Sequence, residues 1–432
     1  MAHPGRRVAA LWEPQEAVFL AYPTAQYVAL DKVHGRRLQD IQAEEVFHLQ
    51  KHVKVTYLVN NQKEMNDFRK YLVKHGADPD RIEFLQVPHC DIWMRDTGPV
   101  FVEVMDVDGH KSLTIPWPGF DNWGHAPYIK KGTSWAKCDI PNFVQRDIAE
   151  HRGFVWERVL HRCHPDGLGR FELSEDQTYI MEGGSTSFNG QGTLITTTQV
   201  VFERNPHMRK QDVEELMAQY YGVKKIIWIP KGLIEDWPLF WGPIQTGPHH
   251  KDKVWTPIVT TGHVDEFCRF VGPHTVLLAE VHGSQDGTLE TINRHRLEAA
   301  AKVLRQSTNQ DGVPLEVVRI PAAPIQIMEM DVKDPQFKQF QHIRNSGLSK
   351  KKSAPILLAC SYVNYLITNG LVLMPKYYHK GTTPEAWAHI DAEAKAVMER
   401  VFPDREVVQL DLLIINAIGG GANCSSSNQP RV

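Results

Sequence analysis

The sequence lacks long apolar runs, paired cysteines and an excess of charge of either sign. No apolar run approaches the roughly 20 residues that cross a membrane. The six cysteines are scattered through 432 residues without a CxxC pair, which excludes a disulfide framework in a chain this long. The 48 Lys and Arg nearly balance the 51 Asp and Glu, so no broad basic surface for nucleic acid is expected. Glu13, Pro14 and Glu16 interrupt the only apolar patch near the start, which makes a signal peptide a poor interpretation. We expect a soluble, cytoplasmic protein without a membrane or nucleic-acid partner.

Low-complexity tracts and long flexible linkers are also missing. What recurs is a helix pattern, with apolar residues at i, i+3 and i+4, followed by a short run rich in Ile, Val and Phe. This pattern occurs at 38–59, 67–88, 213–230, 296–321 and 392–411. Five such units favour a radial or solenoid assembly of repeats over a doubly wound sheet, although an ordinary α/β protein also alternates helices and strands. We predict one α/β domain over residues 1–432.

Two segments interrupt this pattern. Residues 238–257 are rich in proline, glycine and aromatics, which is typical of a long loop. Residues 326–354 carry a lysine run that we interpret as a solvated surface rather than a targeting signal. Both are predicted to be insertions.

Polar residues follow several predicted strands, where α/β proteins place their sites. The first group is DIWMRD at 91–96. In an extended chain, Trp93 and Arg95 would share one face and Asp96 the other. The segment is either an exposed Asp–Arg pair that caps a strand, or a site in which Asp96 faces a planar cation that needs paired oxygen acceptors.

Two further segments combine carboxylates with glycine or histidine. Glu182 precedes two glycines and lies either in a simple turn or in a site where it orients a histidine. In GHVDEF, His263 and Asp265 would share one face of a strand, and a carboxylate there would tune the imidazole for acid/base work. No HExxH or conventional third ligand accompanies them, and HRCH at 161–164 is too tightly spaced for a zinc cage. We expect neither a metal nor a cofactor.

The last candidate is Cys424, which follows three glycines within GGGANC at 419–424. Such a cysteine is either a small buried hydrophobe or a nucleophile. Glycines allow close backbone approach to a substrate, and a neighbouring cation lowers the pKa of a thiol and activates it. Together with a histidine and several carboxylates, the thiol suits attack on a guanidinium carbon. The carboxylates would bind the nitrogens, the thiolate would add, and the imidazole would protonate the departing ammonia.

Seven blocks of the sequence resemble, in order, the agmatine deiminase family, which includes the bacterial-type peptidylarginine deiminases. They lie at 12–23, 91–102, 182–184, 192–208, 262–271, 361–366 and 419–430. The resemblance implies a five-bladed, pseudo-symmetric α/β propeller of ββαβ units around a central site. It also implies metal-free hydrolysis of a small cationic guanidine through a covalent thiouronium on cysteine.

The resemblance assigns roles to individual positions. Cys424 is similar to the family's nucleophile and His263 to its general acid and then base. Asp96 and Asp265 resemble the two guanidinium clamps, and Glu182 the carboxylate that pairs with the histidine and substrate. The positions that resemble contacts near the substrate are Trp93, Asp91, Trp123 and Gly421.

The implied reaction converts agmatine and water to N-carbamoylputrescine and ammonia, a step of polyamine biosynthesis toward putrescine. The sequence departs from the family pattern beside the site, at Thr261, Asn423 and Ser425 among others. Peptidylarginine, free arginine or another guanidine therefore remains an alternative substrate. A non-catalytic propeller that acts as a binding module is a second alternative, and the sequence leaves open whether the chain forms a homo-oligomer.

Overall fold

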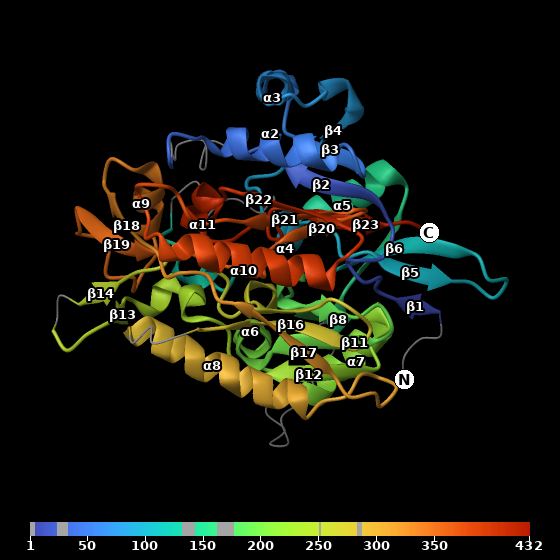
Figure 1. Ribbon diagram of the computed structural model, residues 1–432. Coiled ribbons are helices and arrows are strands. Elements are labelled where there is room, and N and C mark those ends of the chain that lie inside the picture. Colours follow the sequence, from blue (N-terminus) through green and yellow to red (C-terminus); the bar gives the residue numbers. More distant parts are fainter. Residues whose placement is uncertain (1–4, 24–32, 132–142, 162–176, 250–251, 283–286) are drawn as a thin grey trace.

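The computed structural model describes residues 5–23, 33–131, 143–161, 177–249, 252–282 and 287–432. Cys138, Cys163 and most of the HRCH motif lie outside these ranges. Within them, the fold is α/β, as predicted, with mixed sheets inside and helices outside (Figure 1).

Five sheets in this part of the chain share one plan. A first strand pairs antiparallel with a second, and a third strand runs parallel to the second after a helical connection. Three of them have the strand orders β10–β11–β12, β15–β16–β17 and β20–β21–β22. Their strands are β10 (Ser187–Phe188), β11 (Thr193–Thr197), β12 (Lys225–Ile229), β15 (Cys268–Phe270), β16 (Thr275–Glu280), β17 (Glu316–Pro321), β20 (Leu366–Thr368), β21 (Leu371–Pro375) and β22 (Glu406–Leu410). The connecting helices are α6 (Thr198–Arg204), α7 (Lys210–Tyr221), α8 (Thr288–Arg305) and α10 (Ala386–Val401).

The other two sheets add one strand to this plan. The order β1–β5–β6–β7 has an extra antiparallel edge strand, and β23–β2–β3–β4 has an extra parallel one. Their elements are β1 (Arg6–Arg7), β5 (Val102–Met105), β6 (Lys111–Trp117), α5 (Val144–Arg152), β7 (Val155–Arg158), β23 (Ser427–Pro430), β2 (Gln15–Ala21), α2 (Leu38–Leu49), β3 (Lys54–Val59), α3 (Gln62–Lys74) and β4 (Ile82–Gln86). Strand β23, near the end of the chain, therefore pairs with β2, near its start.

All five predicted helix–strand units are present, but they do not correspond one to one with the five sheets. The units at 38–59 and 67–88 belong to the same sheet, where β3 and β4 are neighbours. The unit formed by α5 and β7 was not predicted, because α5 has only 9 residues and β7 reads VWER, without a run of apolar residues.

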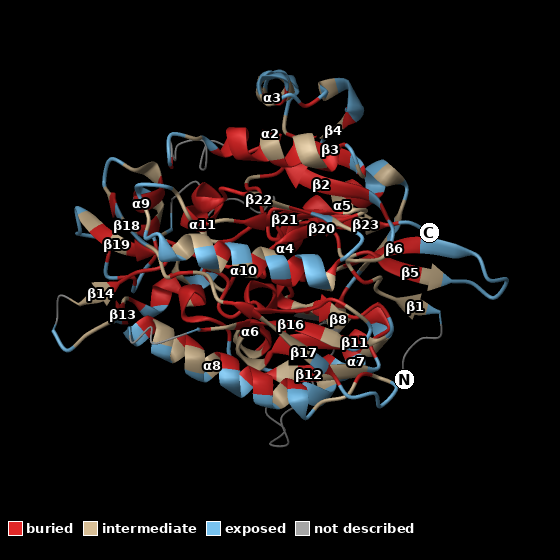
Figure 2. Ribbon diagram, viewed as in Figure 1, coloured by how far each residue is buried: buried red, intermediate tan, exposed pale blue. Residues whose placement is uncertain are grey.

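The core lies between the sheets and their covering helices (Figure 2). Strands β11 and β21 are buried along their whole length, as expected for central strands that are covered on both faces. Helix α8 buries Leu289, Leu297 and Leu304 on one face, and its other face is exposed in Figure 2. None of the described helices is both long enough and apolar enough to span a membrane.

The two predicted insertions lie against each other on one side of the molecule (Figure 1). The prediction of a long loop at 238–257 is wrong in part, because this segment contains the short strands β13 (Ile244–Gln245) and β14 (Lys253–Val254). The second segment contains β18 (Ile327–Asp331), α9 (Pro335–Phe340) and the start of β19 (Ser353–Leu357). The N–H of Trp255 donates to the carbonyl of Pro355 at 3.0 Å, which joins the two segments.

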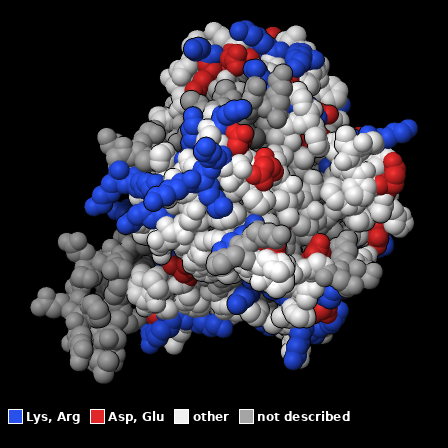
Figure 3. All heavy atoms as spheres, turned by 90° about the vertical axis from the view of Figure 1, so that its left-hand side faces the viewer, with Lys and Arg blue, Asp and Glu red and all other residues white. Residues whose placement is uncertain are grey.

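The lysine run at 350–352 is exposed, as predicted. Lys333, Lys338 and Arg344 of the same segment are also exposed. Figure 3 views the molecule from this side and shows Lys and Arg side chains gathered on its face. The described residues also include the antiparallel pair β8 (Leu160–His161) and β9 (Gln177–Thr178), and the short helices α4 (Met94–Thr97) and α11 (Leu413–Ile418).

Candidate active site

The predicted site residues lie on short segments that lead into the first strand of a sheet. Asp96 is on α4, before β5, and Glu182 precedes the 3-10 turn Gly183–Ser185, before β10. His263 and Asp265 flank the start of the 3-10 turn Val264–Glu266, before β15. Cys424 lies just before β23. Although these positions are far apart in the sequence, the structure brings the five side chains together in the buried interior.

The extended conformation on which two predictions of side-chain direction rest is wrong. Residues 94–97 form a helical turn, and 264–266 form a 3-10 turn, so alternate residues do not share a face there. His263 and Asp265 still face each other, because the turn brings Nδ1 within 3.9 Å of Asp265 Oδ1. These turns are too short to show a helical period in the sequence.

The imidazole of His263 lies among three carboxylates. Its Nδ1 is 3.9 Å from Asp96 Oδ1, and its Nε2 is 3.5 Å from Glu182 Oε2. Both ring nitrogens are buried and have no hydrogen-bond partner among the residues that the structure describes. Burial lowers the pKa of His263, but attraction to Asp96, Glu182 and Asp265 outweighs it and raises that pKa to about 9. The ring is therefore cationic at neutral pH.

Gly184 forms one wall of the space between these groups. A Cβ atom on Gly184 would lie 2.6 Å from His263 Nδ1 and 3.0 Å from both Asp265 Oδ2 and Asp96 Oδ1. Its N–H donates to Asp96 Oδ1 at 3.0 Å, while Trp123 Nε1 donates to the other oxygen at 2.8 Å. Burial raises the pKa of Asp96 to about 6, even though the His263 charge opposes this shift. Only a residue without a side chain leaves the space between the two aspartates and the imidazole open.

Cys424 is buried, with 2% of its surface exposed, and lies beside Asp265. Its Sγ is 3.6 Å from Asp265 Oδ2 and 3.6 Å from Glu266 Oε1. Burial raises the pKa of the thiol well above its usual value, and the charges of Asp265, Glu266 and Asp96 raise it further. The thiol is therefore neutral at neutral pH in the structure described.

Asn364, which precedes β20, organises the nucleophile segment. Its Nδ2 donates to Cys424 Sγ at 3.0 Å and to Glu266 Oε1 at 2.8 Å. Its Oδ1 accepts from the backbone N–H groups of Asn423 and Cys424 at 3.0 and 3.1 Å. With Asn364 included, each of the five sheets contributes one segment to the site.

A buried arginine holds Glu182. Arg204, at the end of α6, donates through Nε to Glu182 Oε1 at 2.8 Å and through its other nitrogens to Thr261 Oγ1 and the Thr260 carbonyl, both at 2.6 Å. Burial alone would raise the pKa of Glu182, but Arg204 and His263 lower it to about 2. Glu182 therefore remains ionised beside the imidazole.

Asp236 fixes the backbone that carries His263. Its carboxylate accepts hydrogen bonds from the N–H groups of Thr260, Thr261 and His263 at 2.7, 3.0 and 2.7 Å, and from that of Gly262. Thr261 and Gly262 have φ values of 66° and 111°, a conformation that is costly for threonine and that this network stabilises.

Sequence reasoning assigned no role to Arg204, Asn364, Glu266 or Asp236. Two of them could have been found, because Arg204 lies in the family-like segment 192–208 and Asn364 in the family-like segment 361–366.

The four predicted substrate contacts occupy different places. Trp123 contacts Asp96 directly, as described above. Asp91 accepts from the Trp93 N–H at 3.0 Å and so shapes the turn before α4. The Trp93 ring packs against Gly420, where a Cβ would lie 2.7 Å from it. Gly421 packs against Asn364. Substrate contact by these residues stays a prediction.

A cavity lies beside the site, next to β5, β10, β15 and β23, and Asp265 is the one predicted catalytic residue among those that line it. It is lined by Arg95, Asp265, Arg269 and Asn423, and by residues 8–12 of the N-terminal segment. Both arginines are already engaged: Arg95 donates to the Asn423 carbonyl and Asn428 Oδ1, and Arg269 donates to carbonyls of Val363 and Tyr365. The bonds of Arg269 use only Nη1, and those of Arg95 use Nε and Nη2, so each guanidinium has further N–H groups and a role for either in binding the carboxylate of free arginine stays open.

Comparison with known proteins places the whole chain among deiminases. The family described as Porphyromonas-type peptidyl-arginine deiminase matches residues 7–237 and 246–430. The unmatched residues 238–245 fall inside the first predicted insertion. An agmatine deiminase from Pseudomonas aeruginosa (strain LESB58) is 30% identical over 360 residues, which cover 82% of this chain and 78% of the relative. An agmatine deiminase from Ectopseudomonas mendocina (strain ymp) is 30% identical over 361 residues, with the same coverage.

The structure of the agmatine deiminase of Enterococcus faecalis has the same fold. It superposes with a TM-score of 0.72 at 22% identity, covering 99% of this chain and 96% of that one. The fold, the site geometry and the family match agree: the chain belongs to the Porphyromonas-type peptidyl-arginine deiminase family.

Proposed function

We propose that this protein is an agmatine deiminase, a hydrolase of the guanidinium C–N bond that forms N-carbamoylputrescine and ammonia. The observation that carries the proposal is the meeting of the Cys424 thiol, the His263 imidazole and the carboxylates of Asp96 and Asp265 around the bare backbone of Gly184. The two relatives at 30% identity, both named agmatine deiminase, support agmatine as the substrate.

The first step is binding of the guanidinium cation. Asp96 and Asp265 accept hydrogen bonds from its nitrogens, because paired carboxylates match the planar geometry of that group. The bound positive charge lowers the pKa of Cys424, whose proton then leaves to solvent. The substrate itself thus converts the neutral thiol into the nucleophile.

In the second step, the thiolate attacks the guanidinium carbon and forms a C–S bond. The resulting tetrahedral adduct breaks a C–N bond when His263, cationic at neutral pH, donates its proton to the departing nitrogen. Ammonia leaves, and a thiouronium cation remains on Cys424. Glu182, kept ionised by Arg204, stabilises the imidazolium before this transfer.

In the third step, the now neutral His263 removes a proton from water. The hydroxide adds to the thiouronium carbon, the C–S bond breaks, and the hydroxyl proton leaves to solvent as the urea product forms. The thiolate and the protonated imidazole are both regenerated. Guanidinium and water have become a urea, ammonia and a proton, so the cycle balances without a cofactor.

We further propose that the five sheets are the blades of an α/β propeller in a single domain, with the two insertions on its side. The shared strand plan and the contribution of one site segment by each sheet support this arrangement. A cytoplasmic location is proposed on the composition of the sequence and a role in polyamine biosynthesis on the resemblance, and assembly into a homo-oligomer stays an open question.

Substitution of the nucleophile tests the activity. Cys424→Ala should abolish ammonia release from agmatine and leave the circular dichroism spectrum unchanged. Asp96→Asn and Asp265→Asn should each weaken substrate binding. Retained turnover by Cys424→Ala would refute the assignment, and unchanged kcat/KM in both asparagine variants would refute the clamp.

Peptidylarginine is the second candidate substrate, because the matching family carries that description. A panel of agmatine, free arginine and a blocked arginine peptide, assayed for ammonia, separates the candidates. We expect agmatine to have the highest kcat/KM. Turnover of none of them, together with no labelling by a haloacetamidine, would favour a non-catalytic binding module.

A further inference from the structure

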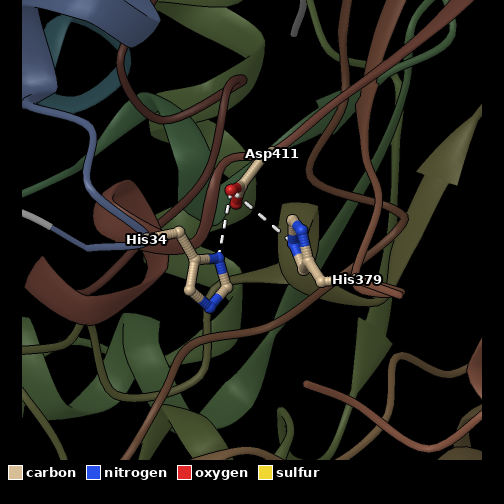
Figure 4. A group of neighbouring side chains, drawn as sticks. All are labelled: His34, His379 and Asp411. Atoms are coloured by element: carbon tan, nitrogen blue, oxygen red, sulfur yellow. Dashed lines mark hydrogen bonds and ion pairs between the residues drawn. The ribbon is translucent and has the colours of Figure 1, made fainter. Parts of the chain in front are cut away.

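Three side chains with metal-ligating atoms lie together outside the candidate active site. Figure 4 shows the rings of His34 and His379 with a nitrogen of each directed toward the carboxylate of Asp411. His34 and Asp411 are 377 positions apart in the sequence, so no motif marks this group.

The distances from each histidine to the carboxylate suit a shared metal ion. His34 Nδ1 is 3.1 Å and His379 Nε2 is 3.6 Å from Asp411 Oδ2, and all three ligand atoms lie within 4.8 Å of one another. Ligand atoms bound about 2.0–2.1 Å from a tetrahedral zinc are about 3.3 Å apart. The two measured distances bracket that value. His379 Nε2 has no hydrogen-bond partner among the described residues.

The backbone at or near each of the three residues is fixed by hydrogen bonds or strand pairing. Asp411 directly follows β22, and its other oxygen accepts the Leu413 N–H at 3.2 Å. His379 follows β21, whose end at Pro375 is paired with Leu410 at the end of β22. His34 occupies the first central position of a tight turn, closed by two hydrogen bonds between Val33 and Arg36. Its φ of 49° and that of Gly35, 74°, match a type I′ turn.

We propose that His34, His379 and Asp411 bind a divalent transition-metal ion of the zinc class. Two imidazoles and one carboxylate form a set that suits zinc, cobalt or nickel, whereas calcium and magnesium prefer oxygen ligands alone. Water would complete the coordination, because 34% of the His34 side chain and 24% of the His379 side chain are exposed.

The metal would be structural and would not take part in guanidinium hydrolysis. It would join the turn at 33–36, the loop after β21 and the start of the segment that runs through α11 to Cys424. Three loops that lie far apart in the sequence would then be fixed to one another at a single point.

Titration with Co²⁺ tests the proposal, because tetrahedral cobalt reports its ligands in the visible spectrum. The Cys424→Ala variant is used beside the wild type, since Asp265, Glu266 and Cys424 form a second group of donor atoms. We expect one Co²⁺ per chain in both proteins, with the absorption of a nitrogen- and oxygen-ligated ion. Addition of Zn²⁺ should displace the cobalt and raise the midpoint of thermal unfolding.

The ligand variants are His34→Asn, which tolerates the left-handed turn, and His379→Ala. Each should weaken Co²⁺ binding by more than about 100-fold. Loss of a residue that only hydrogen-bonds a metal ligand costs about 10- to 100-fold, so a larger effect identifies a ligand. The matched control is His110→Ala, which removes a histidine from the exposed group Asp106, Asp108 and His110 and should bind cobalt as the wild type does. Absence of stoichiometric binding, or equal binding by His34→Asn and His379→Ala, would overturn the proposal and leave the deiminase assignment untouched.

Discussion

A single methyl group at position 184 should block the active site. Gly184 does not have a positive φ, so alanine fits its backbone conformation. The added Cβ would nevertheless lie 2.6 Å from His263 Nδ1 and 3.0 Å from the nearest oxygens of Asp96 and Asp265. That position lies in the space where the guanidinium would bind.

The size of the effect follows from the contacts that the methyl group displaces. Each charge-assisted hydrogen bond to a carboxylate contributes about 1.5–3 kcal/mol. Losing one bond to each aspartate would cost about 3–6 kcal/mol, so kcat/KM should fall by about 10² to 10⁴. Crowding of the packed interior should lower the free energy of unfolding by only about 1–3 kcal/mol, so the variant should still fold.

Ammonia release from agmatine measures kcat/KM, and urea unfolding measures stability. Gly247→Ala is the matched control, because its Cβ would lie 2.6 Å from Asp252 Oδ2 in the connection between β13 and β14, away from the catalytic groups. It should keep wild-type activity. If Gly184→Ala folds and turns over agmatine at the wild-type kcat/KM, the space beside Gly184 is not where the substrate binds.

Three further predictions concern the groups around the thiol and the imidazole. Asn364→Asp replaces the donor to Cys424 Sγ with an acceptor, so kcat/KM should fall by about 10- to 100-fold; alkylation of the thiol by iodoacetamide should slow in parallel, and an unchanged rate would contradict this role. Activity should rise with pH as Asp96 ionises near pH 6 and fall as His263 loses its proton near pH 9; kcat is the quantity to measure, because the thiol has already lost its proton in the substrate complex, and a kcat profile that stays level through pH 10 would exclude His263 as the acid. Arg204→Met removes the arginine partner of the buried Glu182 charge and should cost about 3–5 kcal/mol in urea unfolding, whereas Arg209→Met, which removes an exposed arginine bound to Asp212, should change stability little.

Which reactive residue types meet at the candidate site could be predicted from the sequence, whereas the geometry of the site could not. A thiol, an imidazole and carboxylates have intrinsic reactivity, so Cys424, His263 and Asp96 were recognisable in the sequence. Asn364 carries a neutral amide without reactivity of its own. Its importance depends on Nδ2 lying 3.0 Å from Sγ, and that distance is set by sheets that pair far along the chain.

The repeats show a similar limit. Helix–strand units were predictable where the helix is long, as in α8 and α10, because 16 to 18 residues carry several turns of the apolar pattern. The unit of α5 and β7 is too short to show this apolar pattern. Which units belong to the same sheet depends on which strands pair. Local sequence cannot specify that pairing, because β23 and β2 come from opposite ends of the chain.

The pairing of β23 with β2 has a consequence for synthesis of the protein. The nucleophile lies three residues before a strand that must reach back to the first sheet of the fold. On the ribosome, the other four predicted catalytic side chains are made well before the thiol, and the sheet that contains β2 lacks its edge strand β23 until residue 430 has left the exit tunnel. A chain that terminates or shifts frame before codon 424 would lack the thiol and this strand, so it should show no turnover even though most of the fold has been made.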